Sequence, residues 1–333
     1  MTPEPWIDRL RVLGALAVVA LHVSGPPFRA YPGHPTAAWL AASFWNSATR
    51  WAVPVYLLLS GYLLLGDGRE EGAVAFWRRR AARIVLPLLF WGALYAVWYG
   101  ARTAPEVIGA VLIRADAGYH LWFLYALAVL YALAPLLRAL LAKLPPVGGI
   151  VACAAAFVPF LRIPGIRPLL RADSLPRWLE LGLPVLGYFL LGGLLRRARR
   201  EGPRWPPLLA AAVSLAVVVG GTALSTVRQG SLGGRALQDP LSPAVIVLSS
   251  SLCLLARRAG SHFPGEHLAR FAPAVFGVYL VHPLVLELLA KVGISPERLF
   301  WGLAIPAVTL GAAAVSLALV LGLRRVPLLR RVV

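Results

Sequence analysis

The stretch that decides the fold is DRLRVLGALAVVALHVSG, residues 8–25, in which ten mostly apolar residues separate Arg11 from His22. A helix of about 20 mainly apolar residues is long enough to cross a bilayer. Charged or titratable side chains within such a helix are rare and are usually functional. The stretch therefore predicts a first transmembrane helix that also carries part of a functional site.

Arg11 and His22 are predicted to share one face of this helix. An α-helix turns about 100° and rises about 1.5 Å per residue, so their spacing makes about three turns and separates them by about 16 Å. A purely structural interpretation is also open. In that case Arg11 extends to the lipid headgroups and His22 hydrogen-bonds to a neighbouring helix.

The composition of the chain is that of an integral membrane protein. Of its 333 residues, 59% are hydrophobic and only 14% are charged, against about a quarter in soluble domains. The net charge of +19 does not indicate nucleic-acid binding, because the arginines form clusters between apolar segments, as in cytoplasmic loops. Cys153 and Cys253 lie in apolar segments and are predicted to be free, buried thiols.

The apolar segments predict an all-α, polytopic membrane protein with about ten transmembrane helices in one bundle. We expect one transmembrane domain over 1–333 and no soluble domain. The predicted spans are 7–25, 44–66, 84–101, 119–141, 147–163, 178–195, 206–225, 241–256, 272–290 and 301–323.

The basic residues predict the orientation of these spans. With the N-terminus inside, most Lys and Arg residues lie on the cytoplasmic side, as the positive-inside rule requires. We therefore expect both termini in the cytoplasm and a location in the cell (plasma or inner) membrane. One predicted outer loop is an exception, which indicates either a misplaced boundary or an anionic ligand. Its arginines are Arg162, Arg167, Arg171 and Arg177.

Polar side chains also lie within or at the ends of three other predicted spans. Arg50 lies in the second, His120 and Trp122 at the outer boundary of the fourth, and His282 near the middle of the ninth, before Glu287. Snorkelling, an aromatic belt or helix packing would each explain one of them structurally. Together with the histidine of the first span, they predict a substrate path towards the outer half of the bundle.

A cluster of arginines opens the third span, in FWRRRAARIVLP, residues 76–87. Arg80 and Arg83 are three residues apart and are predicted to project from one side of a helix. The planar forks of arginine suit phosphate groups. The cluster, Arg78, Arg79, Arg80 and Arg83, predicts a phosphate site on the cytoplasmic side, unless it only anchors the loop at lipid phosphates.

These motifs resemble, in order, those of the membrane acyltransferase 3 family, many-span enzymes that O-acetylate cell-surface carbohydrates. Arg11 and His22, with Asp8 before them, match the R-x10-H motif of the family. VPVYLLLSGYLL resembles its second-span motif, although Val55 and Leu57 replace bulkier residues. Similar segments are RRRAARIVLPLLFW, HLWFLYALAVLYALAPLL, LGYFLLGGLL and VYLVHPLVLELL. The resemblance covers most of the chain.

The resemblance implies a membrane-bound O-acyltransferase. It would move an acetyl or other acyl group from cytoplasmic acyl-coenzyme A, normally acetyl-CoA, to a hydroxyl of a cell-surface or lipid-linked carbohydrate. His22 would act as the base or as an acyl carrier, with Arg11 and His120 as further catalytic residues. The arginine cluster would bind the phosphates of coenzyme A. The predicted substrate-binding residues are Arg50, Trp122, His282 and Glu287.

The expected partners are a carbohydrate or glycolipid acceptor and membrane lipids, without nucleic acid. The sequence contains no metal-binding motif, and no metal is expected. The alternative function is a transporter or exporter of a surface glycan or small anion, whose path would carry similar polar residues. The sequence lacks the internal repeat that many transporters show. A sensor or scaffold would not need Arg11 and His22 to be aligned.

Overall fold

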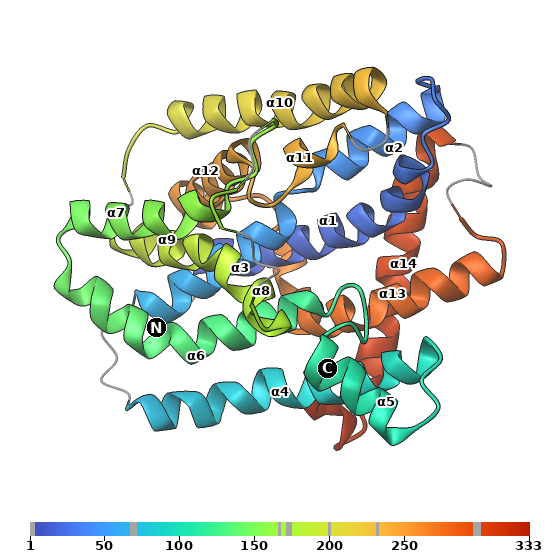
Figure 1. Ribbon diagram of the computed structural model, residues 1–333, viewed down its shortest axis with the longest axis horizontal. Coiled ribbons are helices and arrows are strands. Elements are labelled where there is room, and N and C mark those ends of the chain that lie inside the picture. The colour runs from blue at the N-terminus through green and yellow to red at the C-terminus, as the bar shows by residue number, and fades with distance from the viewer. Residues whose placement is uncertain are drawn as a thin grey trace. The chain divides into compact units, whose positions relative to one another are not determined.

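The computed structural model describes residues 4–66, 72–165, 168–170, 175–198, 201–230, 233–295 and 301–333 (Figure 1). Within these residues the chain is helical and forms no β-strand, which confirms the predicted all-α class. Both cysteines are free and buried, as predicted.

Eight helices of the described chain are long and apolar enough to cross a membrane, so the protein has the build of a multi-pass membrane protein. The predicted span 147–163 corresponds to a shorter apolar helix, Pro146–Phe160, and the first predicted span is the helix Pro5–Arg29. The predicted count of ten stays a prediction. The eight are Ala37–Leu65, Val74–Trp98, Trp122–Lys143, Arg177–Arg197, Trp205–Gln229, Arg235–His262, Glu266–Lys291 and Leu303–Leu323.

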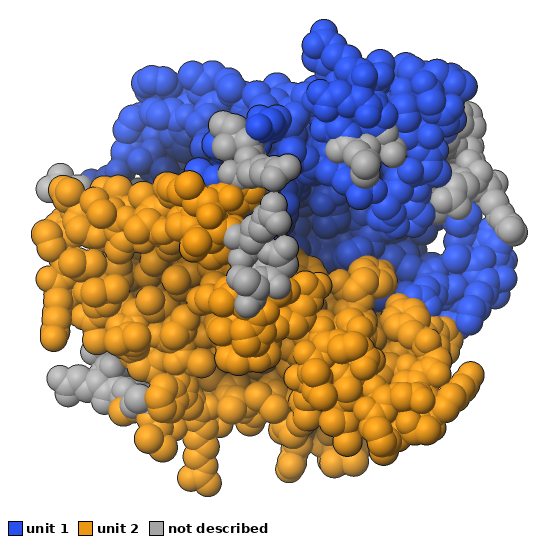
Figure 2. Space-filling view, in the orientation of Figure 1, with its two compact units in different colours: residues 1–56, 161–167, 199–322 blue, residues 57–160, 168–198, 323–333 orange. Residues whose placement is uncertain are grey.

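The chain divides into two compact units, which Figure 2 colours separately. Unit 1 comprises Met1–Tyr56, Leu161–Arg167 and Arg199–Gly322. Unit 2 comprises Leu57–Phe160, Pro168–Ala198 and Leu323–Val333. The single domain over 1–333 stays a prediction.

Helix α1, Pro5–Arg29, forms the core of unit 1. Pro5 suits a first helical position, and Asp8 in the first turn and Arg29 in the last complement the helix dipole. Because α1 is apolar on nearly all sides, it is surrounded by other helices. It packs against α2, Ala37–Ala48, α12, Pro243–Ala259, α13, Val275–Lys291, and the 3-10 helix η6, Glu266–Ala274.

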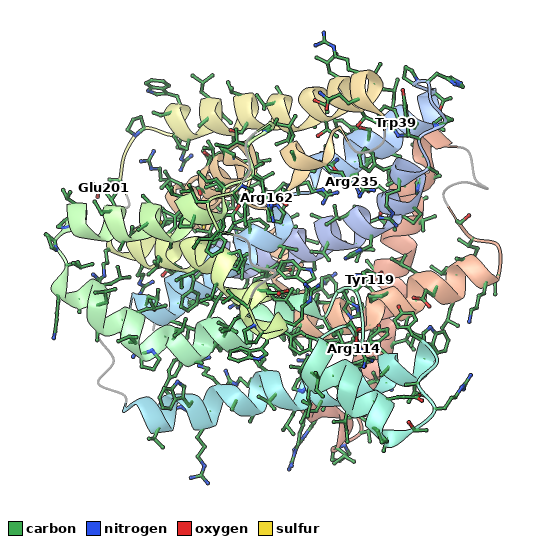
Figure 3. The ribbon with its side chains drawn as sticks, in the orientation of Figure 1. Trp39, Arg114, Tyr119, Arg162, Glu201 and Arg235 are labelled. Atoms are coloured by element: carbon green, nitrogen blue, oxygen red, sulfur yellow. The ribbon has the colours of Figure 1, made fainter. Side chains whose placement is uncertain are left out.

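The remaining helices of unit 1 cover this core. Helix α10, Trp205–Gln229, runs along α12 and α2 (Figure 1). Trp39 of α2, labelled in Figure 3, donates its indole N–H to the Phe28 carbonyl at 3.0 Å and so ties α2 to the end of α1. The unit also contains α11, Arg235–Gln238, the 3-10 helix η5, Gly260–His262, and α14, Trp301–Leu323.

Unit 2 is built from α4, α6, α7, α8 and α9. Helix α6 packs against α4, α8 and α9, and α7 packs against α9. A short π-helix, η1, lies against α4. The elements of this unit are α4 (Ala73–Trp98), α5 (Ala104–Ile108), η1 (Gly109–Arg114), α6 (Trp122–Lys143), α7 (Pro146–Phe157), η2 (Val158–Phe160), α8 (Arg177–Gly182), η4 (Leu183–Val185), α9 (Leu186–Arg197) and η7 (Leu329–Arg331).

Two glycines let α3, Ala52–Leu65, and α9 cross with their backbones in contact within unit 2. A Cβ on Gly61 would overlap the carbonyl of Phe189, and a Cβ on Gly192 would overlap that of Leu58. Small residues permit such close approach between membrane helices. The segments VPVYLLLSGYLL and LGYFLLGGLL therefore meet at one helix crossing.

Candidate functional site

Helix α1 carries both residues of the opening motif on one continuous helix. Arg11 lies two turns from its start, where its guanidinium pairs with Asp8 at 3.2 Å. The hydroxyl of Tyr56 donates to the Arg11 carbonyl at 2.5 Å, and a Cβ on Gly14 would lie 3.2 Å from the Tyr56 ring. Since α1 continues without a break, Arg11 and His22 share a face about 16 Å apart. Arg11 therefore lies away from the groups around His22.

His22 lies beside His282 inside unit 1. The two imidazole rings are 5.2 Å apart between centroids and are tilted by 34°. His282 is fully buried and His22 is half-buried. The packing of α13 on α1 thus brings together two of the predicted site residues that are far apart in the sequence.

The ring of His282 is held by backbone oxygens. Its Nδ1 lies 2.8 Å from the Tyr279 carbonyl and 3.2 Å from the Val278 carbonyl. A carbonyl oxygen only accepts hydrogen bonds, so Nδ1 carries the proton and donates it. In the neutral ring the lone pair then belongs to Nε2.

Arg50 lies at a break between α2 and α3. Pro54 has no N–H for the Arg50 carbonyl four residues earlier, and its ring disfavours a continuous helix there. The break keeps Arg50 in a turn, where its guanidinium donates to Gln238 at 2.9 Å and to the side-chain oxygen of Asn46. Asn46 in turn donates to the Leu21 carbonyl of α1 at 3.0 Å.

Further hydrogen bonds make this arrangement a buried polar network. Gln238 donates to Ser47 at 2.8 Å, and Asn46 donates to Ser24 of α1 at 3.2 Å. All four of these side chains are buried. Because satisfied buried networks are rigid, the guanidinium is held in place beside the turn of α1 that carries His22.

The surroundings of His22 are cationic. The charges of Arg50 and Arg29 act on its ring, as does His282. Asp239 acts on Arg50, but this carboxylate also lies 3.8 Å from Arg162 (Figure 3). Such a site favours an anionic group or a developing oxyanion beside His22.

An apolar cavity of about 220 Å³ lies in unit 1 against α1. Val12 and Leu16 of α1 line it, together with Phe271 of η6 and Val278 of α13. Val278 also supplies one carbonyl to His282. The cavity therefore follows α1 between the levels of Arg11 and the histidine pair, and its lining suits a hydrocarbon chain.

Of the other predicted residues, Glu287 also belongs to unit 1. It follows His282 on α13 by five residues, which turns its side chain by about 140° relative to that histidine. His120 and Trp122 belong to unit 2. His120 is buried before α6, with its ring edge-on to Tyr95 at 4.7 Å, and half-buried Trp122 begins α6.

The arginine cluster lies in the first turns of α4, in unit 2. Arg78, Arg79 and Arg83 are exposed, whereas Arg80 is half-buried, 5.8 Å from the Phe76 ring. Arg80 also lines a groove of about 230 Å³ between α4 and α6. The four guanidiniums are therefore not equivalent, because Arg80 is less exposed than the other three.

The predicted outer loop loses part of its positive charge to ion pairs. Arg162 pairs with Asp239 in unit 1, and Arg177 pairs with Glu180 at 2.8 Å in unit 2. Arg167 and Arg171 lie outside the described residues.

Sequence reasoning missed the residues that hold Arg50. Asn46 could have been found, because it precedes Arg50 by four residues and so lies on the same helix face. Gln238 is 188 residues from Arg50, and no local pattern connects them.

Comparison with known proteins agrees with the motifs. No curated protein and no solved structure matches the chain. Residues 4–323, essentially the whole chain, match the acyltransferase domain family, acyltransferase 3. The protein therefore belongs to this family of membrane acyltransferases.

Proposed function

We propose that the protein is an O-acyltransferase that moves an acetyl or other acyl group from cytoplasmic acyl-coenzyme A to a hydroxyl of a cell-surface or lipid-linked carbohydrate. The observation that carries this proposal is the histidine pair, His22 and His282, beside the immobilised Arg50 in a member of the acyltransferase family. The site combines a proton acceptor with a fixed cation, which is what acyl transfer requires.

His22 has two chemical routes. As a general base it takes the proton of the acceptor hydroxyl, while the hydroxyl oxygen attacks the thioester carbonyl and the thiolate leaves and is protonated. As a nucleophile it forms an acyl-imidazole with release of the thiol, and the acceptor hydroxyl then takes the acyl group and restores the ring. Both routes end with one ester and one thiol.

Arg50 is proposed to stabilise the negative charge that develops on the thioester oxygen. Its guanidinium is held by Asn46 and Gln238, so little reorganisation is needed when the charge appears. The apolar cavity beside α1 would accommodate the hydrocarbon chain of an acyl group longer than acetyl.

The exposed arginines of α4 are proposed to bind the donor phosphates. Arg78, Arg79 and Arg83 present exposed guanidiniums near the start of α4, and guanidiniums suit phosphate oxygens. Acetyl-CoA is the proposed donor, and a carbohydrate or glycolipid is the proposed acceptor. His120 stays a candidate catalytic residue, and Trp122 and Glu287 stay candidates for acceptor binding.

The proposed location is the cell membrane, surrounded by lipid, with both termini in the cytoplasm. In that orientation the arginines of α4 lie on the side where acyl-coenzyme A is made. His22 lies about 16 Å further along its helix than Arg11, towards the outer leaflet, where surface carbohydrates are modified.

The test is acyl-coenzyme A turnover by the purified protein in nanodiscs with a membrane glycan extract. Thiol release and transfer of radiolabelled acetyl are followed for the wild type and His22→Ala. Removal of a general base lowers the rate by about 10²- to 10⁴-fold, so His22→Ala should bind the donor and transfer no label. His34→Ala is the matched control, because His34 is exposed and lies between α1 and α2.

A folded wild type that neither binds nor consumes acyl-coenzyme A, across donors and extracts, would overturn the proposal. Equal turnover by His22→Ala and the wild type would remove His22 from the chemistry. Labelled protein that loses its label only after acceptor is added would favour the acyl-imidazole route.

A further inference from the structure

Helix α13 contains a proline directly after its buried histidine. In an α-helix the N–H of each residue donates to the carbonyl four residues earlier. Pro283 has no N–H, so the regular i→i−4 hydrogen bond to the carbonyl of Tyr279 is missing from α13. Inside a membrane a carbonyl without a donor is costly, and another group must satisfy it.

His282 supplies that donor. Its Nδ1 lies 2.8 Å from the Tyr279 carbonyl, closer than the 3.2 Å to the Val278 carbonyl. The Val278 carbonyl is the one that the N–H of His282 itself reaches in a regular helix. The shorter contact is thus made to the carbonyl that the proline leaves without a helical donor.

We infer that Pro283 is a positioning residue that fixes the tautomer of His282. Because Nδ1 is committed as a donor to Tyr279, Nε2 is left as the acceptor of the neutral ring. A backbone carbonyl that holds one ring nitrogen commonly determines the role of the other. In the dipeptide His282-Pro283, the proline therefore determines which ring nitrogen of the histidine carries the proton.

The ring that lies beside this acceptor is that of His22. The ring centroids are 5.2 Å apart, a separation that an N–H···N hydrogen bond between imidazoles can span. When Nε2 of His282 accepts the N–H of His22, the second ring nitrogen of His22 keeps its lone pair for the acceptor hydroxyl or the thioester. In that hydrogen-bonded state Tyr279 and His282 would orient His22, as a carboxylate orients the histidine of a catalytic triad.

The catalytic consequence rests on the proposed function, whereas the tautomer does not. The first measurement is therefore ¹⁵N NMR of protein labelled at histidine nitrogens, in nanodiscs at neutral pH. The signals of His282 are identified by their loss in His282→Asn. The wild type should show a protonated Nδ1 and an unprotonated Nε2.

Pro283→Ala restores an N–H that competes for the Tyr279 carbonyl. We expect the His282 signals to move towards a mixture of tautomers. Loss of one hydrogen bond of ordinary strength corresponds to a population change of about fivefold, so kcat should fall about three- to tenfold while KM for the donor stays the same. In the His282→Asn background the same change should cause no further loss, because the proline acts through the histidine.

Pro306→Ala in α14 is the matched control. It also replaces a proline inside a helix of unit 1, but Ile305 precedes it. It should leave both the His282 signals and kcat unchanged. An α-hydroxy acid at position 283 lacks the N–H as proline does, and it should restore the wild-type signals even if Pro283→Ala folds poorly.

The inference fails if wild-type His282 carries its proton on Nε2, or if Pro283→Ala leaves Nδ1 fully protonated. Either result is independent of turnover. If the wild type transfers no acyl group but shows the expected tautomer, the proposed function fails and the positioning role of Pro283 stands.

Discussion

Arg50 lies at a helix break with its guanidinium between Asn46 and Gln238. A buried arginine cannot lose its charge, so its surroundings must satisfy its donors. Here two neutral amide oxygens accept from one of its nitrogens, Nη2, and among the described contacts no direct ion pair compensates the positive charge. That is the electrostatic condition for binding a substrate anion or a developing oxyanion.

Arg50→Lys tests this role at the level of one residue. Both amide oxygens accept from Nη2 of the planar guanidinium. Lysine keeps the charge, but its ammonium sits on a shorter, flexible stem and does not reach the same place between the two amides. A lost hydrogen bond to a charged group costs about 1.5–3 kcal/mol, so kcat should fall by about 10- to 100-fold in the radiolabel transfer assay. The lost hydrogen bond should also lower the free energy of unfolding by about 1–3 kcal/mol, so kcat is compared per folded protein.

Arg235→Lys is the control for this change, because Arg235 is exposed in the first turn of α11 (Figure 3). It should transfer acyl groups at the wild-type rate. If Arg50→Lys does so as well, the position of the guanidinium has no part in the rate.

At the scale of the elements, the crossing of α3 and α9 in unit 2 depends on glycine. The backbone carbonyls that face Gly61 and Gly192 cannot move aside as a flexible side chain can. The requirement at these two positions is therefore for a hydrogen atom in place of a Cβ. This gives a packing reason for the glycines of two of the sequence motifs.

Gly61→Ala should destabilise the protein by forcing the two helices apart. Overpacking of a closely packed interior costs about 1–3 kcal/mol, and we expect a clear fall in Tm measured by intrinsic fluorescence in detergent. Gly311→Ala in α14 is the matched control, since no heavy atom lies within 4 Å of a Cβ built there. Alanine is favoured over glycine in a helix by about 0.5–1 kcal/mol, so this control should be neutral or slightly stabilising.

A Gly61→Ala protein with the Tm of the wild type would show that α3 and α9 separate at no cost. The close crossing of the two helices would then not explain the glycines at these positions.

At the scale of the whole molecule, the net charge of +19 includes two groups of arginines in different surroundings. Arg50 and Arg29 act on His22 in unit 1, whereas the exposed arginines of α4 belong to unit 2. The arginines near His22 are proposed to stabilise charge on the reacting atoms. The exposed arginines of α4 are proposed to bind the donor phosphates. Substitution of Arg50 should therefore change kcat, and substitution of an exposed arginine of α4 should change KM for the donor.

Arg83→Gln should raise KM for acyl-coenzyme A and leave kcat unchanged, because phosphate contacts are made equally in the ground and transition states. We expect a severalfold increase that shrinks as salt is added, since exposed charges are screened. Initial rates over a range of donor and salt concentrations measure this. Arg228→Gln removes an exposed charge at the end of α10 and should leave KM unchanged. A fall in kcat without a change in KM for Arg83→Gln would contradict phosphate binding.

The sequence by itself determined the all-α class, the apolar helices and the family, because hydrophobicity and helical spacing are local properties. It also placed Arg11 and His22 on one helix face, since that follows from helix geometry alone. The tertiary structure decided that His282 lies beside His22 and that Gln238 holds Arg50. These contacts join segments far apart in the chain, and only the packing of α13 and α11 within unit 1 brings their side chains within reach.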